Sequence, residues 1–126
     1  MKLEHLGIYA KDSEVLSRWY CEKLGFSVVR KLEKEGRPPI YFLKGEGGWE
    51  LEILPSSASP REKQLTDPGY SHIGLVVDSF EQTESFLQSK GVSLHDVRAT
   101  SNGWKIGYFE DPEGNILEIV YRPAGG

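Results

Sequence analysis

The sequence His5-Leu6-Gly7-Ile8 returns later in the chain as His72-Ile73-Gly74-Leu75, and Leu51-Glu52-Ile53-Leu54 returns as Leu117-Glu118-Ile119-Val120. The two copies follow in the same order and keep their spacing to within one residue. Each copy places one imidazole and one carboxylate inside an otherwise apolar, strand-like run. Burying such groups is costly unless a partner satisfies them. Matched His and Glu residues in both copies therefore predict a bound divalent metal ion.

The composition suits a globular protein and excludes two classes of partner. The chain has 126 residues, of which 38% are hydrophobic, and a net charge of −4. That charge argues against nucleic-acid binding, which needs a basic face to displace phosphate counterions. No run approaches the roughly 18 apolar residues of a membrane span. Cys21 is the only cysteine, so no disulfide framework exists and we expect a cytoplasmic protein.

The first half of the chain predicts one strand, one helix and then three strands. Strand-like runs cover 3–10, 26–33, 40–44 and 49–54. Between the first two, apolar residues recur at helical spacing, with Asp12 or Ser13 as the N-cap and Gly25 as the stop. Glycine- and proline-rich turns at 36–39 and 45–48 separate the later strands.

The second half repeats this order. Strands are expected at 70–77, 92–97, 105–110 and 116–121, with a tight turn at 111–115. A helix opens at Ser79, with Gln82 completing a capping box, and ends at Gly91. We therefore predict an α+β fold in one domain, 1–126. Its two tandem βαβββ modules, about 1–54 and 70–122 with a linker at 55–69, form a curved mixed sheet around a metal-binding cleft.

Strand periodicity decides which side chains share a face with each histidine. Residues two apart in a strand point the same way, so His5 shares its face with Gly7 and Tyr9. A glycine two residues beyond each histidine leaves room for a ligand. Glu50 and Glu52 lie on the same face of their strand. Spacing from the preceding turn favours Glu52, and Glu50 stays open as the alternative.

These residues resemble the vicinal oxygen chelate superfamily, which includes glyoxalase I, extradiol dioxygenases and bleomycin-binding proteins. The resemblance runs from Lys2 to about Arg122, and the segments 71–78 and 109–118 carry it most specifically. It implies paired βαβββ modules wrapped around a metal. It also implies a homodimer, with the site either within one chain or across two.

Glyoxalase-I-like members use a His, Glu, His, Glu ligand set, matched here by His5, Glu52, His72 and Glu118. Such a mixed nitrogen and oxygen set suits Ni, Co, Zn, Mn or Fe. The resemblance implies a lyase or isomerase whose small α-hydroxycarbonyl or thiol-adduct substrate binds the metal through two oxygens. Glu118 would move the proton by way of an enediolate, with Glu52 as its counterpart. Alternatives are a dioxygenase or thiol transferase, or a non-catalytic binding protein of bleomycin type.

Candidate substrate contacts are Tyr9 beside His5, and Asn102, Trp104 and Lys105 in an irregular segment before a strand. Bacterial glyoxalase I proteins carry an arginine where this chain has Tyr9, so recognition of glutathione stays open. We interpret His95 as a residue that does not bind the metal. The expected partner is thus a small molecule rather than a nucleic acid or a membrane.

Overall fold

The computed structural model describes residues 1–59, 62 and 64–124, which divide into two compact units, Met1–Arg61 and Glu62–Gly126. The predicted linker, 55–69, contains residues 60, 61 and 63, which lie outside the described residues. Each unit is described by itself below.

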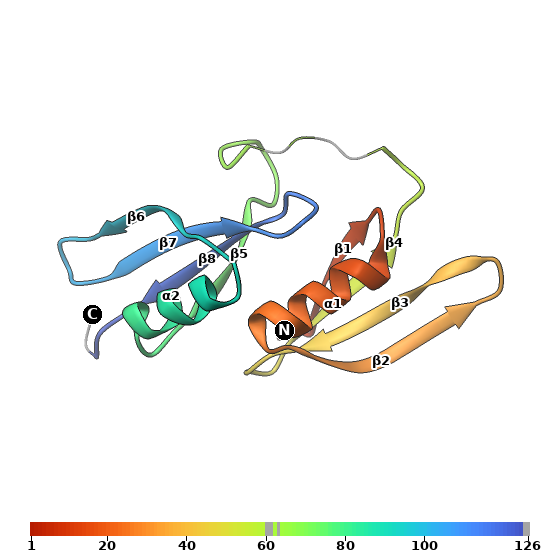
Figure 1. Ribbon diagram of the computed structural model, residues 1–126, viewed down its shortest axis with the longest axis horizontal. Helices are drawn as coiled ribbons and strands as arrows, with labels where there is room; N and C mark the ends of the chain where they lie inside the picture. The colour runs from red at the N-terminus through yellow and green to blue at the C-terminus, as the bar shows by residue number, and fades with distance from the viewer. Residues whose placement is uncertain (60–61, 63, 125–126) are drawn as a thin grey trace. The chain divides into compact units, whose positions relative to one another are not determined.

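The first unit is a four-stranded mixed sheet with one helix. Its elements are β1 (His5–Ala10), α1 (Ser13–Leu24), β2 (Ser27–Lys34), β3 (Arg37–Lys44) and β4 (Glu50–Pro55). The strand order is β1-β4-β3-β2, with β1 parallel to β4 and the other neighbours antiparallel (Figure 1). This is the predicted βαβββ arrangement.

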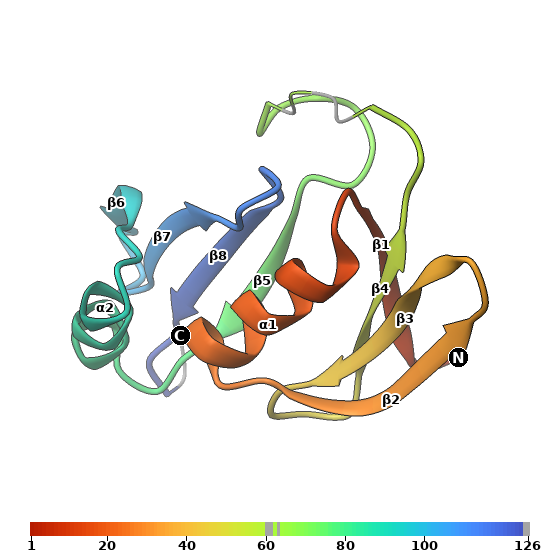
Figure 2. The same cartoon turned by 45° about the vertical axis from the view of Figure 1, so that its right-hand side comes forward.

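The second unit repeats the plan. Its elements are β5 (His72–Val76), α2 (Phe80–Ser89), β6 (His95–Ala99), β7 (Lys105–Glu110) and β8 (Ile116–Tyr121). The order β5-β8-β7-β6 again places the first and last strands side by side in parallel (Figure 2). The α+β fold with tandem βαβββ modules is therefore confirmed.

The predicted helix boundaries are set by local capping. Asp12, rather than Ser13, is the N-cap of α1, and its carboxylate accepts a hydrogen bond of 3.0 Å from the Val15 amide. Gly25 ends this helix with a φ of 75°, a left-handed conformation that glycine adopts without steric cost. Ser79 caps α2 by accepting from the Gln82 amide at 3.3 Å.

Two predicted strands start three residues away from their observed first residue. Strand β3 starts at Arg37 rather than 40, because the two prolines there fall at an irregularity in the β2–β3 register and remove no paired donor. Strand β6 starts at His95 rather than 92. Val92 instead closes helix α2, since its amide donates to the Leu87 carbonyl at 2.8 Å.

In each unit the helix-covered sheet face supplies apolar core residues, and the second unit also buries Ile106, Tyr108, Ile116 and Val120 on its other face. Leu16 and Tyr20 of α1 are buried in the first unit, as are Leu51 and Ile53 of β4. The second unit buries the corresponding set from α2, β7 and β8: Phe80, Leu87, Phe109, Leu117 and Ile119. The opposite face of each sheet carries the histidine and the glutamate.

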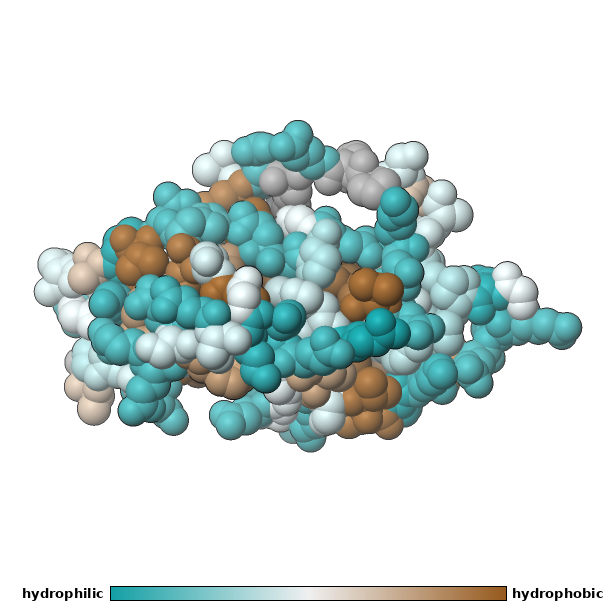
Figure 3. Space-filling model, in the orientation of Figure 1, coloured by the Kyte–Doolittle hydropathy of each residue, from teal (hydrophilic) through white to brown (hydrophobic). Residues whose placement is uncertain are grey.

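The surface view is dominated by hydrophilic residues, with hydrophobic residues gathered into separate patches (Figure 3). Among the described residues, no helix is both long enough and apolar enough to cross a membrane.

Candidate metal centre

Parallel pairing of β1 with β4 brings His5 and Glu52 together. Gly7 lies opposite Glu52 in the register, so His5 is two residues away on the same strand face. The His5 Nε2 and Glu52 Oε1 atoms are 3.7 Å apart. A Cβ placed on Gly7 would lie 3.5 Å from the same carboxylate oxygen. Because Gly7 has no side chain, the space beside the Glu52 carboxylate stays open.

The second unit builds the same pair more tightly. Gly74 lies opposite Glu118 in the β5–β8 register, and His72 Nε2 is 3.1 Å from Glu118 Oε2. Both glutamate side chains are mostly buried, with 14% of Glu118 and 18% of Glu52 exposed. The chain thus positions a half-buried imidazole beside a carboxylate twice.

The Nδ1 atom of each imidazole has an acceptor beside it, which favours a proton on Nδ1. The Ser71 hydroxyl donates to the Leu65 carbonyl at 3.0 Å, so its oxygen accepts from His72 Nδ1 at 2.8 Å. In the first unit His5 Nδ1 faces the Glu4 carboxylate at 2.6 Å, and a carboxylate only accepts. In the neutral imidazole with its proton on Nδ1, each Nε2 presents a lone pair toward the neighbouring carboxylate.

This donor set fits a divalent metal ion. Two electron-pair donors held face to face repel one another unless a cation or a proton lies between them. Neutral imidazole and carboxylate are the donors that Zn, Ni, Co, Mn and Fe accept. Among the described residues, no group of three or more His, Cys, Asp or Glu side chains could hold a metal. The structure therefore brings together two His–Glu pairs, and the four-residue metal ligand set stays a prediction.

Glu50, the alternative ligand, has a different partner. It lies opposite His5 in the register, but its carboxylate accepts a hydrogen bond from the Arg30 guanidinium. The matching position in the second unit is Ile116, which lies opposite His72 and cannot bind a metal. The Arg30 contact of Glu50 and the absence of a carboxylate at Ile116 therefore both favour Glu52 as the candidate metal ligand.

Tyr108 is a polar neighbour of the second pair that sequence reasoning missed. It lies directly opposite Glu118 on β7, and its ring meets the His72 ring edge-on, with centroids 5.6 Å apart. Burial raises the pKa of the Tyr108 phenol, and its hydrogen bond to Glu118 raises the pKa further. The Arg98 hydrogen bond and charge act in the opposite direction. The matching residue opposite Glu52 is Phe42, so comparing the two copies was the signal available.

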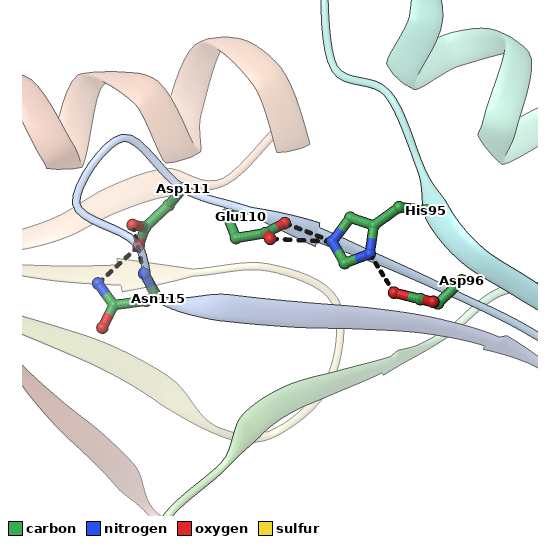
Figure 4. Close-up of polar contacts among 5 residues, drawn as sticks. All are labelled: His95, Asp96, Glu110, Asp111 and Asn115. Carbon is green, nitrogen blue, oxygen red and sulfur yellow. Dashed lines mark hydrogen bonds and ion pairs between the residues drawn. The ribbon is translucent and has the colours of Figure 1, made fainter. Parts of the chain in front are cut away.

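His95 belongs to a polar cluster at the outer edge of the same sheet (Figure 4). Its Nδ1 is 2.6 Å from Asp96 Oδ2 and its Nε2 is 2.7 Å from Glu110 Oε2. The hydrogen bonds to Asp96 and then to Glu110 raise the pKa of His95, against the opposing effect of desolvation. Both ring nitrogens are thus engaged with carboxylates, and the interpretation that His95 does not bind the proposed metal stays a prediction.

The predicted 111–115 turn follows Glu110, and Figure 4 shows the contacts between Asp111 and Asn115 within it. The Asp111 carboxylate accepts from the backbone amides of Glu113 and Asn115, at 2.9 and 3.0 Å. It also accepts from the Asn115 side-chain amide at 2.8 Å. This turn fixes the position from which β8 carries Glu118 along the sheet.

The predicted substrate residues do not all face the ligand pairs. Tyr9 shares the His5 face of β1 and is 68% exposed. Trp104 lies beneath the Arg122 guanidinium at 4.4 Å, and Asn102 accepts a hydrogen bond from Thr100. Lys105 lies on the helix-covered face of β7, where its Nζ contacts Glu81 at 3.1 Å and the Phe80 ring at 4.8 Å.

Two βαβββ units, each with a mixed four-stranded sheet, constitute the vicinal oxygen chelate fold. The model of the Glyoxalase/Bleomycin resistance protein/Dioxygenase superfamily matches residues 2–119, and the chain belongs to this superfamily.

Relatives with this fold cover almost the whole chain. A glyoxalase family protein from Enterococcus faecalis is 30% identical with a TM-score of 0.81, covering 94% of this chain and 96% of that one. The uncharacterized protein YwkD of Bacillus subtilis is 29% identical over 121 residues, covering 93% of this chain and 94% of YwkD. The lactoylglutathione lyase of Schizosaccharomyces pombe is 26% identical over 141 residues; the match covers 94% of this chain and 47% of that enzyme.

Proposed function

We propose that this protein is a metal-dependent lyase or isomerase of glyoxalase type. Its substrate would be a small α-hydroxycarbonyl compound or thiol adduct that offers two neighbouring oxygens. The observation that carries the proposal is the repeated pair, in which a histidine Nε2 faces a carboxylate beside a glycine in both units. Membership of the superfamily and the similarity to a lactoylglutathione lyase support it.

The proposed ligands are His5, Glu52, His72 and Glu118, for Ni, Co, Zn, Mn or Fe. A bound divalent metal would act as a Lewis acid, polarising a substrate carbonyl and making the adjacent C–H more acidic. Glu118 is the proposed base that takes that proton and returns it to the neighbouring carbon. Glu52 is its proposed counterpart. The low exposure of both carboxylates keeps water from competing for the proton.

The proposed substrate contacts differ in how well their surroundings support them. Tyr9 shares a strand face with His5 and offers an exposed aromatic surface. Asn102 and Trp104 occupy the irregular segment before β7. Lys105 is engaged by Glu81 and would have to leave that partner to reach a substrate. Tyr9 is therefore the contact best supported.

The test is turnover by protein that has been stripped with a chelator and reloaded with one metal at a time. Suitable substrates are the adducts of a 2-oxoaldehyde with glutathione and with a smaller thiol. Glu118→Gln should lower kcat by about 10²–10⁴-fold, as expected for loss of a general base. Glu113→Gln, in the 111–115 turn, is the matched control and should leave kcat unchanged. Full turnover by a metal-loaded Glu118→Gln protein would remove Glu118 from this role.

The proposal extends to the assembly and setting of the protein. We propose a homodimer that acts on a small molecule in the cytoplasm. Sedimentation equilibrium of the chain with and without metal measures the assembly directly. A monomer at every concentration would overturn the dimer while leaving the proposed reaction open to the turnover test.

A further inference from the structure

The two glutamates of the ligand pairs face different neighbours on the next strand. Glu52 of β4 lies opposite Phe42 of β3, whereas Glu118 of β8 lies opposite Tyr108 of β7. Side chains directly opposite in antiparallel strands have Cβ atoms about 4.5–5.5 Å apart, so they interact. The two copies therefore differ by one hydroxyl group beside the proposed catalytic carboxylate.

The Tyr108 ring is held firmly in place. It is only 9% exposed and belongs to a buried cluster with Ile106, Ile116 and Val120. One edge contact joins it to the His72 ring at an interplanar angle of 89°. A side chain fixed on this many sides can direct its hydroxyl at a defined target.

The hydroxyl forms hydrogen bonds with a cation, Arg98, and with an anion, Glu118. Arg98 is purely a donor and an ionised Glu118 purely an acceptor, so the phenol oxygen accepts from Arg98 and its O–H donates to Glu118. A phenol polarised by a guanidinium is a stronger donor to a carboxylate. Phe42 offers Glu52 no such bond, although the Arg30 guanidinium lies 4.8 Å from the Phe42 ring centroid.

We infer that Tyr108, with Arg98 behind it, is a positioning residue that orients the Glu118 carboxylate and makes it functionally distinct from Glu52. The inference rests on the proposed function, because orientation matters only if Glu118 binds the metal or moves the proton. Hydrogen-bonded partners of metal ligands commonly set ligand orientation in this way. The hydrogen bond from Tyr108 would hold the carboxylate of Glu118, rather than that of Glu52, in a fixed orientation for the substrate.

The contact itself is tested first in metal-free protein, independently of any activity. Urea unfolding of Tyr108→Phe, Glu118→Ala and the double variant measures the coupling between the two side chains. Phe42 occupies the matching site in the first unit, so Tyr108→Phe is expected to fold. The coupling should change the unfolding equilibrium constant by about 2–10-fold, as for one hydrogen bond. Tyr41→Phe combined with Glu118→Ala is the control and should be additive.

The role is tested next by cobalt titration of chelator-treated protein, followed by visible absorption. Tyr108→Phe should raise the Kd for Co²⁺ by about 10–100-fold, whereas Tyr41→Phe should leave it unchanged. Additive unfolding, or a Tyr108→Phe protein with the parent's Kd, overturns the inference and leaves the proposed function intact. A parent protein that takes up no Co²⁺ overturns the proposed function, and the positioning role fails with it, whatever the unfolding result.

Discussion

The two units share a backbone plan and a His–Glu pair. They differ in the basic side chain on the edge strand, β2 or β6, and in the carboxylate that contacts it. In the first unit Arg30 pairs with Phe42 across the strands and donates to Glu50. In the second unit His95 takes the matching place beside Tyr108 and contacts Glu110. The first cation is permanently charged, whereas the second is a cation only when its imidazole is protonated. The His–Glu pair is thus present in both units, whereas its polar surroundings differ.

A second difference lies beneath the helices. Tyr41 lies opposite Ile53 in the first unit, and Gly107 lies opposite Ile119 in the second. The absence of a side chain at Gly107 makes room for Phe80 and Leu94, whose atoms would lie 3.2 and 3.1 Å from an added Cβ. Each unit therefore fills the same layer of its core with different residues. The same His–Glu pair therefore forms over two cores of different composition.

The largest predicted effect comes from truncating matched core leucines. Leu51 and Leu117 flank the two glutamates, and both are fully buried. Leu51→Ala and Leu117→Ala should each lower the free energy of unfolding by about 2–5 kcal/mol. Urea denaturation followed by circular dichroism measures both. A loss of less than about 1 kcal/mol for either substitution would show that its unit lacks the described core. The two units would then not be built alike.

A smaller effect is expected at the glycine that distinguishes the two cores. Gly107→Ala should destabilise by about 1–3 kcal/mol, because the new methyl group crowds three side chains at once. Gly74→Ala is the matched control. Its Cβ would meet only the Glu118 carboxylate at 3.8 Å, an ordinary contact. Thermal unfolding of the two variants compares them, and equal midpoints would show that Gly107 does not create the space for Phe80.

The smallest effect is a pH dependence confined to the second unit. Hydrogen bonds to Asp96 and then Glu110 raise the pKa of His95, while burial beside the Tyr108 ring opposes them. The stabilisation is therefore complete below about pH 6.5, the unfolded pKa, and is lost as pH rises through the raised pKa of the folded protein. Because His95 is almost half exposed, the effect should stay below about 1 kcal/mol.

His95→Gln isolates this contribution. The difference in urea midpoint between the parent and His95→Gln should be larger at pH 6 than at pH 9. Arg30→Gln is the matched control in the first unit, and its difference from the parent should be the same at both pH values. A pH-independent His95→Gln difference would show that the cluster does not stabilise the fold through the imidazolium ion.

Local signals in the sequence were sufficient for the fold. The repeated strands, Ser79 and Gly25 predicted both modules, because capping and strand periodicity depend on neighbouring residues alone. The prolines at 38 and 39 misled the β3 boundary, since only the register shows that they remove no paired donor.

The site was predictable only in part. His5 and Glu52, and likewise His72 and Glu118, stand out because the repeat marks them. Tyr108 lies opposite Glu118 through the regular β7–β8 pairing, whereas the place of His95 beside Tyr108 depends on the irregular β6–β7 register. A single sequence does not reveal that register. The partner of Lys105 was missed for a similar reason, because Glu81 reaches it from the helix.

The central claim is that both His–Glu pairs serve as ligands of one metal ion. The most direct measurement is metal content by inductively coupled plasma mass spectrometry, on protein purified without chelator or metal-affinity steps. The parent is compared with His5→Ala/Glu52→Ala, His72→Ala/Glu118→Ala and a Glu113→Ala control. We predict about one metal per site in the parent and the control, and none in either double variant. Full metal content in one double variant, or none in the parent even after titration, would contradict the account.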